Sequence, residues 1–96
     1  MRQRGGAKVK EVAYMIVNRL GIHARPAAEI AKIASKYDCN VTLKGNNKNA
    51  NAKSLLMIMA LGIKNGQEVT IAVDGPDEEK AIEALDVLIT NNFYED

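Results

Sequence analysis

The stretch from Asn18 to Ala27 most constrains the fold, because a strand-like run ends just before it and a helical pattern starts just after it. Gly21 permits a sharp turn there, and Pro26 suits the first turn of a helix, where its missing N–H would have no partner in any case. His23 is the only histidine of the chain, and it is therefore expected at or next to the N-cap of a helix. Free backbone N–H groups gather at such a position, and the helix dipole favours negative charge there.

His23 and Arg25 give this helix start a chemistry that suits phosphate. A histidine titrates near neutrality, so its neutral ring can act as a nucleophile at physiological pH. Arg25 stands two residues further on and adds a fixed planar cation that matches phosphate oxygens. Taken alone, a histidine at a helix start is more often a plain surface residue. With these neighbours, His23 can form a covalent phosphohistidine whose phosphoryl group is held by backbone donors.

The hydrophobic pattern predicts an α+β domain with helices packed on a sheet, in the order β-α-β-β-α-β-α. Strands are expected at residues 11–17, 39–44, 48–52 and 68–73, and helices at residues 24–37, 55–61 and 77–90. The first strand is apolar throughout, which predicts that both of its faces are at least partly covered. The tail from Asn91 to Asp96 is expected to fray.

Turn and cap residues separate these elements. Gly45, Asn46 and Asn47 form a turn signal, since asparagine tolerates positive φ better than most residues. Ser54 suits the N-cap of the short second helix, and Gly62 suits the left-handed residue that ends it. The stripes expected to face the core are Ala27, Ile30, Ala31 and Ala34, widened by Ile33 and Tyr37, and on the last helix Ala81, Ile82, Leu85, Leu88 and Ile89.

Composition limits the possible functions. The 96 residues favour one domain, expected at 9–92 after a flexible extension at 1–8. The net charge of +1 does not support binding to nucleic acid, and no apolar run is long enough to insert into a membrane. Cys39 is the only cysteine, so it is expected to be a small buried hydrophobe in a reducing, cytoplasmic setting. A metal site is not expected, because the sequence offers no second histidine and no cysteine cluster.

Two blocks of the sequence stand out together: Gly21–Ala27, and Lys53–Gly62 with Gly66 shortly after it. In these blocks the chain resembles the HPr family, the histidine-containing phosphocarriers of the bacterial phosphotransferase system. The resemblance extends from Glu11 to Thr90, which is nearly the whole chain. It implies an HPr-like open-faced β-sandwich, in which three helices cover one face of a four-stranded antiparallel sheet.

The resemblance also implies a function. His23 would accept a phosphoryl group from phosphorylated enzyme I and pass it to IIA proteins in phosphoenolpyruvate-dependent sugar uptake, with Arg25 in contact with the phosphate. Such a protein is a carrier rather than an enzyme, needs no cofactor and is expected to be a monomer. Partner contacts are expected on the first two helices, at Ala24, Ala28, Leu55, Leu56 and Met59. On the second helix, Leu55, Ile58 and Gly62 are expected to face inward, while Leu56 and Met59 stay partly exposed.

Alternatives remain open beside this function. In many HPr proteins the serine that matches Ser54 is phosphorylated by an HPr kinase, so the chain could be a regulatory module that acts through a transcription regulator. Leu20 stands where many members carry a small polar residue, and Asn18 could take over its bond to the imidazole or its cap. This pattern and the ending 92–96 resemble NPr, the paralogue of the nitrogen-related phosphotransferase system. A small metal-binding or ligand-binding domain is a third reading, but it lacks ligand clusters.

Overall fold

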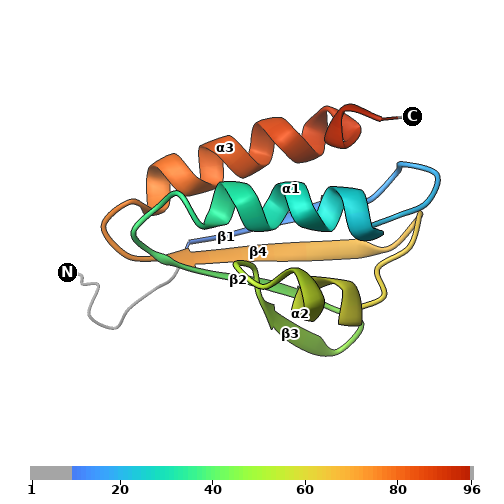
Figure 1. Cartoon of the computed structure of the whole chain (residues 1–96), viewed down its shortest axis with the longest axis horizontal. Helices are drawn as coiled ribbons and strands as arrows, with labels where there is room; N and C mark the ends of the chain where they lie inside the picture. Colours follow the sequence, from blue (N-terminus) through green and yellow to red (C-terminus); the bar gives the residue numbers. More distant parts are fainter. Residues whose placement is uncertain (1–9, 96) are drawn as a thin grey trace.

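The computed structural model describes residues 10–95, so the flexible extension expected at 1–8 lies outside the described residues. One antiparallel sheet has the strand order β1-β4-β2-β3, and helices connect and cover it (Figure 1). The elements in chain order are β1 (Lys10–Met15), α1 (Ala24–Ala34), β2 (Asn40–Gly45), β3 (Lys48–Asn51), α2 (Leu55–Ala60), β4 (Glu68–Asp74), α3 (Glu78–Thr90) and the short 3-10 turn η1 (Asn92–Tyr94).

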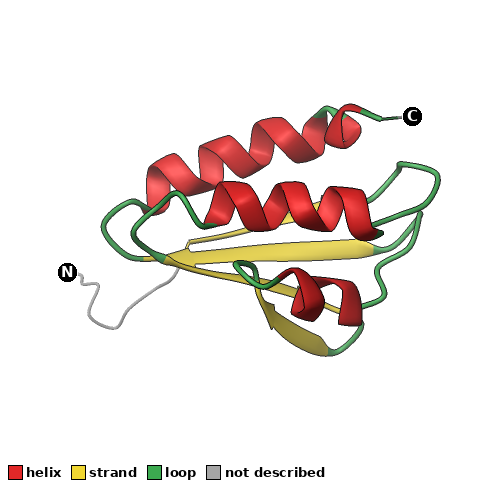
Figure 2. Cartoon of the chain, in the orientation of Figure 1, coloured by secondary structure: helices red, strands yellow, loops and turns green. Residues whose placement is uncertain are grey.

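The three helices lie on one side of the sheet, as Figure 2 shows by colour, and the core fills the space between the two layers. The central strand β4 has Val69, Ile71 and Val73 buried against the helices. Ile30 of α1 and Leu85 of α3 are fully buried against this face. The predicted α+β class, element order and open-faced sandwich are therefore confirmed.

The edge strand β1 differs from its prediction, because only one of its faces is covered. Within the strand Tyr14 is buried and Met15 is 56% exposed, and just beyond it Ile16 is buried and Val17 is 56% exposed. Side chains alternate across a strand, and helices cover only one side of this sheet. The prediction from the unbroken apolar run, that both faces of β1 are at least partly covered, is therefore wrong.

The helix α1 ends at Ala34, three residues before the predicted end. Lys36 and Tyr37 still bond to backbone carbonyls three residues back, so the chain tightens before it turns. Asp38 then exchanges two hydrogen bonds with Asp77, which lies just before α3. The connection from α1 to β2 therefore ends the helix earlier than predicted. On α3, all five residues predicted to face the core are buried.

The hairpin between β2 and β3 forms at the predicted turn. Asn46 and Asn47 have φ of 50° and 63°, the positive values that a tight two-residue hairpin turn needs. The amide of Asn46 also donates to the backbone oxygen of Leu61 at 2.8 Å and accepts from Gln67 Nε2 at 3.0 Å. These bonds fasten the hairpin to the end of α2, which explains why the weakly apolar β3 is a strand.

The short helix α2 has the predicted caps, but its buried face is narrower than predicted. The Ser54 side chain accepts a hydrogen bond from the Met57 N–H at 3.3 Å, and Gly62 follows the helix with φ of 66°. Ile58 is the one buried residue of this helix, whereas Leu55 is 38% exposed. Leu55 therefore does not face inward as predicted, and neither does Gly62, since Leu61 is buried in its place. A six-residue helix offers too few turns for a longer buried stripe.

The predicted fraying of the tail is wrong for residues 91–95. Phe93 is 3% exposed, and Asn92, Phe93 and Tyr94 all have positive φ. Each such residue costs about 1–2 kcal/mol, and burial of one phenylalanine side chain returns only about 1.5–3 kcal/mol. Further contacts hold this turn: the Tyr94 and Glu95 N–H groups bond the carbonyls of Asn91 and Asn92, and the Glu95 side chain bonds Asn18 and His23.

Candidate functional site

His23 occupies the N-cap of α1, as predicted, but its side chain does not cap the helix. The Ala27 N–H bonds the His23 carbonyl at 3.0 Å and opens the helical ladder. The first-turn N–H groups of Ala24 and Arg25 have no partner within the helix, and Pro26 has no N–H to satisfy. The imidazole is one-third exposed, at 33%. It stands beside a helix terminus whose N–H groups can bind an anion.

The segment that precedes β4 holds the loop before His23 in place. The Ile22 N–H bonds the Ile63 carbonyl at 2.9 Å. Gly21 has φ of 69°, and a Cβ there would meet the Ile63 oxygen at 2.5 Å. A side chain at position 21 is thus excluded both by conformation and by space, which explains the glycine in the sequence block.

Glu95 lies against His23 and was not among the predicted site residues. Its Oε1 is 3.0 Å from His23 Nε2, and its Oε2 is 4.0 Å from an Arg25 guanidinium nitrogen. Asn18 Nδ2 donates to the same Oε1 at 2.8 Å. The acidic ending was visible in the sequence, but 72 residues separate it from His23, and no local pattern predicts that they meet.

The surroundings of Glu95 act on its charge in opposite directions. Burial disfavours the carboxylate, but hydrogen bonds from His23 and Asn18 and the positive charges nearby outweigh it, so the pKa of Glu95 lies below its usual value. A carboxylate can only accept, so Nε2 of His23 carries the proton of this bond. In the neutral ring, the lone pair then lies on Nδ1.

Asn18 takes a different role from the one predicted. Its amide bonds neither the imidazole nor the helix terminus, but reaches Gly21 and Glu95 instead. Arg25 is 65% exposed and Leu20 is 60% exposed, and both line a shallow depression around His23. Its volume of about 250 Å³ is below the roughly 300–1,000 Å³ of pockets that enclose small molecules.

The predicted partner-binding residues lie on neighbouring helices, because α2 packs beside α1. Ala24 and Ala28 are exposed on α1. Leu55, Leu56 and Met59 are exposed on α2, with Leu56 the most open at 78%. Met57 is also exposed, at 46%, although it was not among the predicted partner-binding residues. Ser54 is half-buried at the start of α2 and does not line the depression around His23.

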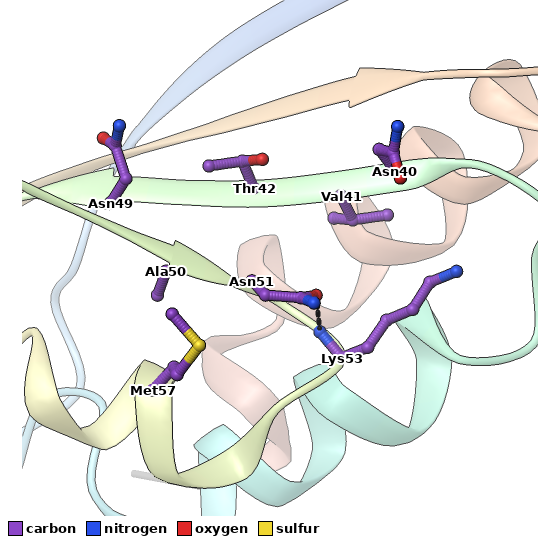
Figure 3. A pocket seen from close by; sticks show the side chains of 8 residues that line it. All are labelled: Asn40, Val41, Thr42, Asn49, Ala50, Asn51, Lys53 and Met57. Atoms are coloured by element: carbon purple, nitrogen blue, oxygen red, sulfur yellow. Dashed lines mark hydrogen bonds between the residues drawn. The ribbon is translucent and has the colours of Figure 1, made fainter.

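A larger crevice lies beside the β2–β3 hairpin, away from His23, with a volume of about 460 Å³ (Figure 3). Its lining residues are Asn40, Val41, Thr42, Asn49, Ala50, Asn51, Lys53 and Met57. The one charged group among them, the Lys53 ammonium, bonds the Tyr37 carbonyl at 3.3 Å. No lining residue supplies a carboxylate, imidazole or thiol, so the crevice offers no acid–base pair.

The thiol of Cys39 and any metal-binding cluster are the other groups that could supply chemistry. Cys39 is buried as predicted, and burial raises the pKa of its thiol. Within residues 10–95, no cluster of three histidine, cysteine or acidic side chains could hold a metal ion. No helix in this same range is both long enough and apolar enough to cross a bilayer.

The histidine at the start of α1 does not cap its helix, and it lies beside an arginine in an open depression. This arrangement suits a carrier of phosphoryl groups better than an enzyme that encloses its substrate in a pocket. The model of the family described as the PTS HPr component phosphorylation site matches residues 10–91. The chain belongs to the HPr family, the phosphocarrier proteins of the phosphotransferase system. A phosphocarrier of this family is not an enzyme in itself.

Known relatives match most of the chain. The phosphocarrier protein HPr of Mycoplasma capricolum is 46% identical over 74% of this chain and 80% of its own length. The phosphocarrier protein HPr of Treponema pallidum is 41% identical over 84% of this chain and 92% of its own. The crystal structure of HPr-C-His from Thermoanaerobacter tengcongensis superposes with a TM-score of 0.86 at 45% identity, covering 91% of this chain and 98% of that one.

Proposed function

We propose that this protein accepts a phosphoryl group on Nδ1 of His23 from phosphorylated enzyme I and passes it to IIA proteins. The setting would be phosphoenolpyruvate-dependent sugar uptake in the cytoplasm. The observation that supports the acceptor atom is the 3.0 Å bond between His23 Nε2 and the Glu95 carboxylate. Because that bond occupies Nε2, it leaves Nδ1 as the nucleophile.

The proposed step needs no proton to leave the attacking nitrogen. The Nδ1 lone pair forms a bond to phosphorus while the donor's bond to phosphorus breaks. The imidazole gains positive charge as this happens, and the Glu95 carboxylate on Nε2 stabilises that charge. Arg25 would pair with the phosphoryl oxygens, and the first N–H groups of α1 would donate hydrogen bonds to them. The reverse step returns the same lone pair to His23 when a IIA protein takes the group.

The shape of the surface supports protein partners rather than a small-molecule substrate. The depression around His23 is too small to enclose a metabolite, so the donor must bring its phosphoryl group on its own surface. The exposed apolar side chains of Ala24, Ala28, Leu55, Leu56 and Met59 offer such a partner a surface to bury. Methionine adapts to differently shaped partners, which suits a carrier with more than one of them.

The deciding experiment incubates the protein with enzyme I and phosphoenolpyruvate and measures the intact mass. One added phosphoryl group that is lost in acid, and that His23→Ala does not acquire, is the expected result. A mass increase that survives acid, or one retained in His23→Ala, would contradict the assignment.

A second role in regulation is supported by Ser54. This residue is half-buried at the start of α2, next to the exposed Leu55 and Leu56. Phosphorylation there by an HPr kinase would add up to about two negative charges to the partner surface. A transcription regulator could read this form, and an NPr-type role remains the alternative branch. Treatment with HPr kinase and ATP, followed by peptide mass analysis at Ser54, tests this role.

A further inference from the structure

Asn18 is the only polar side chain that is buried among residues 10–95, with 1% exposure. Its Nδ2 donates to the Gly21 carbonyl at 2.7 Å and to Glu95 Oε1 at 2.8 Å. Its Oδ1 has no partner among the described residues. A flipped amide would place Oδ1 against these two acceptors, so the orientation is fixed by the network.

Stability alone does not explain this amide. A buried acceptor without a partner destabilises the folded state, and an apolar side chain of similar size would avoid that loss. The backbone around Asn18 is already held by another residue, because Asn65 Nδ2 donates to the carbonyls of Val17 and Asn18 at 2.9 and 3.2 Å. What the Asn18 side chain adds is its pair of donated bonds.

Both of these bonds lead to His23. The Gly21 carbonyl that accepts from Asn18 also accepts from the His23 N–H at 3.1 Å. The Glu95 oxygen that accepts from Asn18 is the same oxygen that bonds the imidazole. Asn18 thus ties the backbone before His23 to the carboxylate that holds its ring.

We propose that Asn18 is a positioning residue, which holds Glu95 on Nε2 of His23 and thereby keeps Nδ1 unprotonated and directed outward. Asn18 does not touch the phosphoryl group, and it acts through Glu95. Its effect on phosphoryl transfer rests on the proposed function, whereas its effect on the ring does not.

The experiment compares Asn18→Ala and the bulkier Asn18→Leu with Glu95→Ala, which removes the acceptor of the Nε2 proton, using ¹⁵N NMR of the imidazole at a pH where the ring is neutral. The protein as it stands should hold a single tautomer, protonated on Nε2. In all three variants a fraction with the proton on Nδ1 should appear. Asn65→Ala is the matched control, since it loses two bonds to the same loop but none to Glu95. Its tautomer should not change.

The rate of phosphorylation by enzyme I adds a second measurement. Asn18→Ala should accept the phosphoryl group about tenfold more slowly, as expected for one lost bond to a charged group. Asn18→Ala combined with Glu95→Ala should be no slower than Glu95→Ala alone, because Asn18 acts through the carboxylate. Losses that add, or a tautomer change in Asn65→Ala equal to that in Asn18→Ala, would overturn the proposal.

The two proposals fail in different ways. If the tautomer changes as expected but the protein is never phosphorylated, the positioning role stands and the carrier function falls. If the protein is phosphorylated normally and the ring of Asn18→Ala and Asn18→Leu keeps its tautomer, the positioning role falls. Should both Asn18 variants fail to fold, an unchanged tautomer in Glu95→Ala would by itself overturn the proposal.

Discussion

The two helix starts at His23 and Ser54 use their N-cap residues in opposite ways. The Ser54 side-chain oxygen accepts a hydrogen bond from the Met57 N–H of its own helix. His23 makes no such bond, and its ring turns instead to Glu95 at the far end of the chain. An N-cap side chain is available for chemistry only where the cap is not made, and the terminal N–H groups then remain available to an anion.

What replaces the cap also differs between the two helices. The start of α2 is stabilised locally, within three residues of Ser54. The start of α1 is held by long-range contacts: the Ile63 carbonyl bonds the loop before His23, and the Glu95 carboxylate bonds the His23 ring. Substitutions at Ser54 should therefore mainly change the stability of the fold, whereas substitutions around His23 should mainly change the rate of phosphoryl transfer.

The largest expected effect is that of His23→Ala. It should abolish acid-labile phosphorylation and leave the fold intact, because the side chain caps nothing and is one-third exposed. Intact mass after incubation with enzyme I and phosphoenolpyruvate measures the first, and circular dichroism measures the second. A variant that unfolds would mean that His23 holds the start of α1, as Ser54 holds that of α2.

Arg25→Ala should slow transfer without removing the acceptor. A lost charge-assisted contact is worth about 1.5–3 kcal/mol, hence roughly ten- to a hundredfold in rate if it acts in the transition state. Lys32→Ala is the matched control, because Lys32 lies on the same helix and is equally exposed at 65%. Equal rates for these two variants would refute a catalytic role for Arg25.

Ser54→Ala and Ser54→Asp should separate stability from function. Loss of the cap costs about 1 kcal/mol, or roughly 4–8 °C in Tm for a domain of this size, with phosphoryl transfer nearly normal. Aspartate keeps an acceptor at the N-cap and should retain the Tm, but its charge lies beside Leu55 and Leu56, where a partner would have to bury it. If Ser54→Asp accepts phosphate as well as wild type in titrated transfer assays, Ser54 is only a cap.

The smallest effect concerns pH and Glu95. Since the folded-state pKa of Glu95 is lowered, its contribution to stability is present above the unfolded pKa and is lost as pH falls through the folded one. Wild type should therefore be more stable than Glu95→Gln at neutral pH, and the two should converge in acid. Urea titrations across this range measure the gap. A gap independent of pH would show that the bond to His23 does not stabilise the start of α1.

Local patterns predicted the parts of the fold that local physics determines. The five core residues of α3 follow helical spacing, and the turn at Asn46 and Asn47 follows from the φ that asparagine tolerates. His23 at the N-cap of α1 followed from Gly21 and Pro26 on either side of it. The open face of β1 and the exposed Leu55 were missed, because burial depends on which neighbours arrive, and no strand or helix encodes its neighbours alone.

The sequence by itself determined the helix start at His23 and the cation beside it, because Gly21, His23 and Arg25 lie within five consecutive residues. Only the tertiary structure decided how the ring is held. Phe93 is buried in the core, the turn at 92–94 has positive φ at all three residues, and Glu95 directly after it bonds a histidine 72 residues away. Asn18 became part of the site for the same reason: a buried amide acquires its partners from packing, and packing joins residues that the sequence keeps apart.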